Sequence, residues 1–187
     1  MNTRIPQGFM AAAVAALVFA GTAQAQERPF EVSLDGGLAY TTFDVSESLT
    51  QFVLPFQQAR LSLYVAPQWA VEGAVLYDYM TQDEDSQSQL LLVPGMSYYL
   101  APFDSGENRT YVTGLVSFDR VGFDVGTVDG SSSQFGLGGR IGTKLPVGDT
   151  GFVRLEAGYT YLMENEDDGR EAANRFDLTV GLGAVLN

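Results

Sequence analysis

The stretch that decides the fold is Phe176-Asp177-Leu178-Thr179-Val180-Gly181-Leu182-Gly183-Ala184-Val185-Leu186, at the end of the chain. Large apolar residues occupy every second position, and Asp, Thr and Gly lie between them until Val185 breaks the division. Successive side chains of a β-strand point to opposite faces, so this alternation predicts a strand with one apolar and one polar face.

The same alternation recurs throughout the chain after residue 25, and no segment there repeats apolar residues at helical spacing. In 111–122 neither register gives a consistent apolar face, which predicts a bulge. We expect strands at residues 30–43, 55–66, 69–81, 89–101, 109–122, 132–145, 151–163 and 174–187. The pattern therefore predicts an all-β chain with eight strands.

The connections between these strands alternate roughly between shorter and longer stretches. The shorter ones are 66–68, 102–108 and 146–150, and the longer ones are 44–54, 82–88, 123–131 and 164–173. Short turns at one end and longer polar loops at the other are typical of bacterial outer-membrane barrels, whose termini lie on the short-turn side in the periplasm.

The N-terminus has the features of a secretory signal peptide. Arg4 precedes an almost wholly apolar run at 9–20, and Ala23-Gln24-Ala25 is a small-x-small cleavage site. The run is shorter than the roughly 18 residues of a membrane-spanning helix. We expect residues 1–25 to be removed and residues 26–187 to form one barrel domain.

Charge and composition exclude several function classes. The net charge of -13 disfavours a nucleic-acid partner. The chain has no cysteine and no histidine, so disulfides, thiolate metal sites and Ser–His or Cys–His pairs cannot form. We therefore expect no catalysis, no cofactor and no metal site.

The polar faces of the strands carry charged residues together with many glycines, such as Gly158 and Gly181. Glycine is hard to justify on a solvated face, but inside a narrow barrel it makes room for charged side chains. A buried charge needs a partner. The sequence thus predicts a structural ion-pair network in the lumen, formed by Glu31, Asp35, Arg60, Glu72, Arg140, Lys144, Arg154, Glu156 and Asp177.

Strand length and aromatic residues also favour a membrane barrel. Most expected strands reach the 9 to 11 residues, roughly, that cross the apolar layer at a tilt. Aromatic side chains near strand ends suit the two membrane interfaces: Phe30, Trp69, Tyr79, Phe103, Tyr161 and Phe176. We predict an eight-stranded antiparallel up-and-down transmembrane β-barrel.

Three segments resemble the small outer-membrane barrel family that includes the OmpA transmembrane domain, OmpX and opacity-type proteins. They are PGMSYYL at 94–100, EAGYTY at 156–161 and VGLGAVL at 180–186. The resemblance implies a location in the bacterial outer membrane and recognition of the last strand by the assembly machinery. The chain ends in Asn187, where that family usually has Phe.

These observations predict a monomeric structural or surface-interaction protein that contacts outer-membrane lipid and lipopolysaccharide. Two alternatives remain: a narrow channel for small or hydrophobic solutes, as in OmpW-like barrels, and a secreted lipocalin-like binder. The acidic stretches 83–85 and 164–169 could bind divalent cations that bridge to lipopolysaccharide, although solvated loops explain them more simply. An EF-hand starting at Glu164 would need Glu where Arg175 stands.

Overall fold

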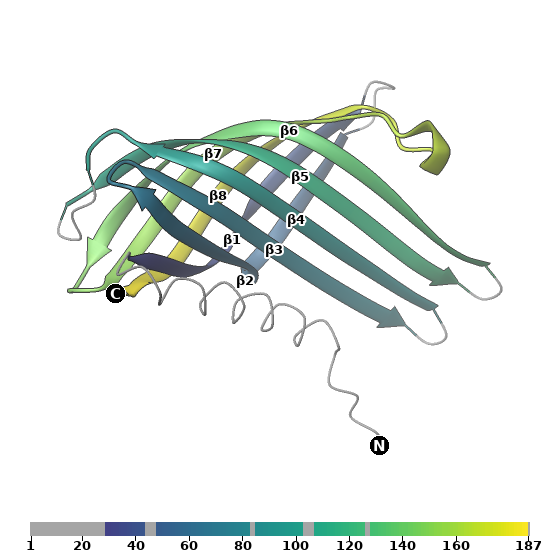
Figure 1. The fold of residues 1–187 in the computed structure, drawn as a ribbon. Coiled ribbons are helices and arrows are strands. Elements are labelled where there is room, and N and C mark those ends of the chain that lie inside the picture. The colour runs from purple at the N-terminus through teal and green to yellow at the C-terminus, as the bar shows by residue number, and fades with distance from the viewer. Residues whose placement is uncertain (1–28, 44–47, 83–84, 103–106, 126–127, 187) are drawn as a thin grey trace, which may run out of the picture.

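The computed structural model describes residues 29–43, 48–82, 85–102, 107–125 and 128–186, so the expected signal peptide at 1–25 lies outside the described residues. Eight strands form a closed barrel in sequence order, with β1 next to β8 (Figure 1). Within the described ranges, no helix is long and apolar enough to span a membrane.

All strand pairs are antiparallel, which confirms the predicted up-and-down topology. The strands are β1 (Phe30–Phe43), β2 (Ser48–Ala66), β3 (Trp69–Gln82), β4 (Asp85–Tyr99), β5 (Arg109–Val125), β6 (Val128–Val147), β7 (Gly151–Leu162) and β8 (Ala173–Leu186). Connections 67–68, 100–108 and 148–150 share one end of the barrel with the C-terminus, here called the turn end (Figure 1). The opposite end is the loop end.

Most large apolar side chains face outward, and most charged side chains of the strands face the lumen. In β8, Leu178 and Val180 are 59% and 54% exposed, although both are aliphatic. In β7, Arg154 and Glu156 are buried, whereas Leu155 between them is exposed. A soluble barrel has the opposite arrangement, because its apolar side chains must leave water. The orientation is that of a barrel with lipid around it.

The strands are longer at the loop end than the sequence predicted. β2 begins at Ser48, β3 and β4 turn between Gln82 and Asp85, and β5 and β6 turn between Val125 and Val128. Three of the four expected longer connections are therefore shorter than predicted. The backbone ladder continues through polar residues there, since its hydrogen bonds do not depend on alternating side chains.

Strand β5 is regular, so the predicted bulge in it is wrong. Its pairing with β6 runs from Arg109–Lys144 to Val125–Val128 without a register shift. The shifts lie between β1 and β2, at Asp35/Gly37, and between β2 and β3, at Tyr64/Ala66. The alternation in β5 was obscured because large Leu115 faces inward while Gly114 faces outward.

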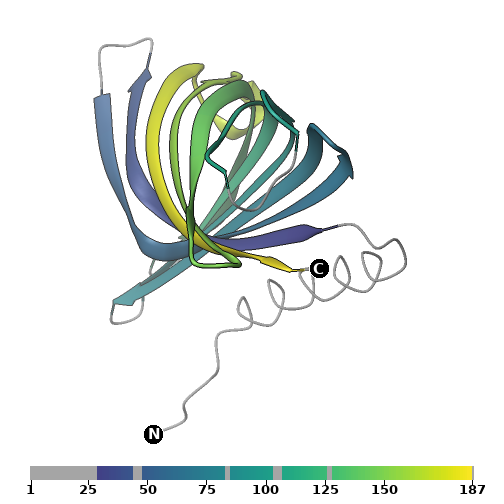
Figure 2. The same ribbon diagram turned by 90° about the vertical axis from the view of Figure 1, so that its left-hand side faces the viewer.

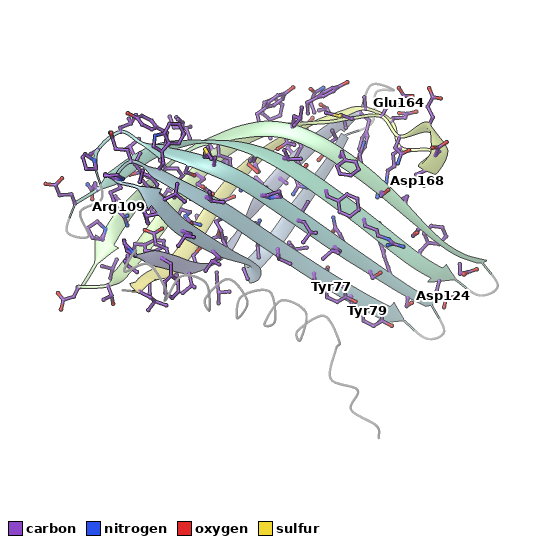
Figure 3. The ribbon with its side chains drawn as sticks, in the orientation of Figure 1. Tyr77, Tyr79, Arg109, Asp124, Glu164 and Asp168 are labelled. Atoms are coloured by element: carbon purple, nitrogen blue, oxygen red, sulfur yellow. The ribbon has the colours of Figure 1, made fainter. Side chains whose placement is uncertain are left out.

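Exposed aromatic side chains lie near both ends of the strands. Trp69 lies at the turn end, and Tyr79, Tyr161 and Phe176 lie toward the loop end. Figure 3 shows Tyr79 near the end of β3, opposite in the molecule to Arg109 at the start of β5. Phe103 lies outside the described residues.

Candidate functional site

The turn-end half of the lumen contains a network of ion pairs with Arg60 at its centre. Arg60 Nε lies 2.9 Å from Asp35 Oδ2. Its Nη1 lies 2.7 Å from Glu156 Oε1 and 3.6 Å from Glu72 Oε2. A single guanidinium on β2 thus joins carboxylates from β1, β3 and β7, which holds opposite walls of the barrel together.

Glu31 on β1 forms a second centre of the network. Arg109 Nη2 lies 2.7 Å from Glu31 Oε1, and Lys144 Nζ donates to Glu31 Oε2. Arg154 lies 4.0 Å from Glu31 and donates a 3.2 Å hydrogen bond to Asp35. Glu31 and Asp35 lie on one strand, so Arg154 links the two centres.

The network is electrically balanced. Removing these groups from water is costly, and the cost is offset only where each charge has opposite charges and hydrogen bonds around it. Equal numbers of both signs meet that condition. The anions are Glu31, Asp35, Glu72 and Glu156, and the cations are Arg60, Arg109, Lys144 and Arg154.

Three buried tyrosines pack beside the charges. The Tyr99 ring lies 5.2 Å from that of Tyr64 and 5.1 Å from that of Tyr111. The Tyr64 hydroxyl donates to Glu31 over 2.8 Å, and the Tyr111 hydroxyl donates to Glu156 over 2.7 Å. The rings fill space that water would otherwise occupy, while their hydroxyls complete the carboxylate hydrogen bonding.

Seven of the nine residues predicted for the lumen meet in this network. Arg140 and Asp177 instead pair with each other over 3.4 Å, nearer the loop end. The sequence analysis missed Arg109, because the register of β5 was not assigned. A signal was present: Arg109, Thr113, Ser117 and Asp119 fall on alternate positions of one face.

The described part of the chain holds no group of three or more acidic side chains placed to bind a metal ion. The β7–β8 connection contains a short 3-10 helix, η1 (Glu166–Asp168). The Asp168 carboxylate in this helix accepts hydrogen bonds from the amide and the hydroxyl of Ser133. Residues 83–84 of the other acidic stretch lie outside the described residues.

A family model described as "Outer membrane protein beta-barrel domain" matches residues 11–184. The chain belongs to this family. Its fold is similar to that of Neisserial surface protein A, at 16% identity and a TM-score of 0.62, covering 83% of this chain and 96% of that one. No curated protein matches the sequence.

Two further solved barrels share the fold. The attachment invasion locus protein Ail of Yersinia pestis is 13% identical with a TM-score of 0.52, covering 86% of this chain and all 100% of its own. The N-terminal barrel domain of Pseudomonas aeruginosa OprF is 11% identical with a TM-score of 0.55, covering 84% and 97%.

Membership of the outer-membrane barrel family agrees with the outward apolar rows. Proteins of this kind reside in the bacterial outer membrane. The alternative of a secreted lipocalin-like binder is therefore wrong, since it requires the apolar faces of the strands to line the cavity. The buried ion-pair network is the candidate functional site of this chain.

Proposed function

We propose that this protein is a non-catalytic barrel with a structural or surface-interaction role, and that its ion-pair network closes the lumen to solutes. The observation that carries the proposal is the balanced network, whose side chains are nearly fully buried. An eight-stranded barrel has an interior just wide enough for its side chains. We infer that paired charges and tyrosine rings filling this half would leave no continuous water path for a solute.

The lack of catalysis rests on the same contacts. Each carboxylate of the network lies within 4.0 Å of a cation. A general acid must donate a proton to substrate and a general base must accept one, whereas these carboxylates are enclosed and already paired. The sequence supplies no histidine or cysteine as a substitute.

The proposal places both termini in the periplasm and the loop end at the cell surface. It is supported by the even number of strands, which brings both ends of the barrel chain to one side. The partners are outer-membrane lipid and lipopolysaccharide around a monomer, and the assembly machinery that reads β8 during insertion. Nucleic acid is not among them, given the charge of -13.

Single-channel recording in planar bilayers tests the closed lumen. We expect negligible conductance from the natural chain, because an ion would have to displace buried ion pairs. Glu156→Gln should raise the conductance by leaving part of Arg60 unpaired. Arg120→Gln, which removes an exposed charge at the loop end, is the control. Discrete openings of the natural protein that change on neutralising Arg60 or Glu156 would establish the narrow channel instead.

A further inference from the structure

The charged residues of the ion-pair network divide into two sets along the chain. Strands β1 to β3 supply three carboxylates and one guanidinium, so this N-terminal set has a formal charge of -2. Strands β5 to β7 supply three cations and one carboxylate, so this C-terminal set has a formal charge of +2. The N-terminal set is Glu31, Asp35, Arg60 and Glu72, and the C-terminal set is Arg109, Lys144, Arg154 and Glu156.

The ion pairs run mainly from one set to the other. Every residue of the C-terminal set forms an ion pair with the N-terminal set. Lys144 on β6 donates to Glu31 on β1, and Arg154 Nη1 on β7 lies 3.2 Å from Asp35 Oδ2 on β1. Strands β4 and β8, which separate the two sets around the barrel, contribute none of the eight residues. Each of these pairs therefore spans at least one intervening strand.

Closure of the sheet is what brings the two sets together. In an uncurled sheet with the same strand order, β1 lies six strand spacings from β7, which at about 4.8 Å each is roughly 29 Å. In the barrel, β1 and β8 pair along a common seam, and Figure 2 shows them side by side, β1 in purple and β8 in yellow. Arg154 and Asp35 meet only in this closed arrangement.

Before closure, each set carries charge that the other set must neutralise. Uncompensated charge is costly in apolar surroundings, where water does not solvate it. Two sets of opposite sign attract each other over a distance, and the attraction is stronger in a medium of low dielectric constant than in water. It also grows as the two edges of the sheet approach. The arrangement of charges thus favours the closed barrel over the open sheet before any single ion pair has formed.

We propose that the two sets act as an electrostatic latch, which draws the edge strands β1 and β8 together while the barrel forms in the membrane. The latch depends on the total charge of each set, so it is distinct from the stability that individual ion pairs give to the finished barrel. The proposal goes beyond the structural role of the network and does not depend on whether the lumen conducts.

Two substitutions of the same kind test the latch, because they change the attraction in opposite directions. Glu31→Gln and Glu156→Gln each remove one buried carboxylate, from side chains that belong to residues only 1% and 5% exposed. Glu31→Gln lowers the N-terminal set to -1 and halves the attraction, whereas Glu156→Gln raises the C-terminal set to +3 and increases it by half. At roughly 29 Å and an effective dielectric constant of about 20, the first should slow closure about fivefold and the second should speed it about fivefold.

The measurement separates insertion from closure during folding of the urea-unfolded chain into lipid vesicles. Trp69, the one tryptophan of the chain, faces outward near the turn end, so its fluorescence follows contact with lipid. The shifted gel mobility of unheated samples, taken over time, follows the closed barrel. We expect the two substitutions to change the second rate in opposite directions and to leave the first unchanged.

A different result rejects the latch. If both substitutions slow closure, or if neither changes it, the ion pairs act one by one and the charge of the sets is irrelevant. Lys144→Gln, which lowers the C-terminal set to +1, should slow closure as Glu31→Gln does. Arg120→Gln removes an exposed charge outside both sets and should leave the rate of closure unchanged.

Replacement variants keep the test decisive where a protein gives no folded band. Asp35→Asn makes the same change to the N-terminal set as Glu31→Gln and takes its place. Arg60→Gln brings the N-terminal set to -3 and takes the place of Glu156→Gln. Arg60 is the centre of the network, so faster closure in a protein that has lost these ion pairs would be strong support for the latch.

Discussion

Several lumen glycines are required because a charged side chain already occupies the place of their Cβ. A Cβ on Gly181 would lie 2.0 Å from Asp35 Oδ1. Arg60 and Arg154 hold that carboxylate, so it cannot turn away without loss of its ion pairs. Gly73 differs, because a Cβ there would meet nothing within 4 Å.

This difference predicts opposite effects of the same substitution. Gly181→Ala should destabilise the barrel by about 1–3 kcal/mol through overpacking. Gly73→Ala should stabilise it by about 0.5 kcal/mol, since alanine restricts the unfolded chain more than glycine does. Urea unfolding of both variants in vesicles measures the two values. Equal effects would show that the Asp35 site is not tightly packed.

In most strands other than β5 the sequence was sufficient to separate inward from outward residues, because alternation decides the face of each side chain. It predicted Arg60, Glu72 and Glu156 to be inside, as the structure places them. The sequence could not predict which charged residues form ion pairs with each other. Arg60 meets partners from three other strands, and these depend on the register of every seam between them.

Among the elements, the β7–β8 connection is the longest at the loop end and is fixed to β6. Asp168 Oδ2 accepts hydrogen bonds from the Ser133 amide over 2.6 Å and the Ser133 hydroxyl over 2.8 Å. Asn165 Nδ2 adds a third over 3.0 Å. Gln134 Nε2 donates to two carbonyls of the same segment, those of Met163 and Glu171.

The attachment should depend on pH. Hydrogen bonds from the Ser133 hydroxyl and amide lower the pKa of Asp168 from its ordinary value of 3.8. A lowered pKa stabilises the docked connection above pH 3.8, and that contribution is lost as pH falls through the lowered pKa. Acidification below the lowered pKa of Asp168 should therefore increase hydrogen exchange at the Ser133 amide, after correction for the pH dependence of the intrinsic exchange rate.

Two neutral variants serve as controls for this effect. Asp168→Asn should loosen the Ser133 amide already at neutral pH, whereas Asp167→Asn in the same turn should leave it protected. If acid loosens the amide equally in the Asp168→Asn protein, another group is responsible for the pH dependence.

At the level of elements, the sequence predicted the number and order of strands but not where the hairpins end. Outside the apolar band, β5 and β6 continue through Asp124, Asp129 and Gly130, which carry no alternating signal. Pairing there depends on the neighbouring strand and not on the residue pattern. For the same reason, nothing in the sequence indicated that the β2–β3 ladder ends at Gln58 and Leu76.

For the whole molecule, lipid outside and paired charges inside are two consequences of one alternation. An open edge would leave backbone groups unpaired in hydrocarbon, so the sheet must close, and closure encloses the polar faces. The enclosed charges then need partners of opposite sign, which the balanced network provides.

A charged side chain that faces the lipid should destabilise the folded barrel by an amount that depends on its depth in the bilayer. Val180, midway along β8, and Val147, at the turn end of β6, are similarly exposed, at 54% and 57%. Val180→Arg should cost about 2–4 kcal/mol in a bilayer and Val147→Arg about 0–1 kcal/mol, because only the first guanidinium must stay in hydrocarbon. Urea titration of folding into lipid vesicles measures both, with Val180→Ala and Val147→Ala as size controls. Equal costs for the two arginines would mean that β8 does not cross the apolar layer in the register seen here, since exposure to water would then be the same at both positions.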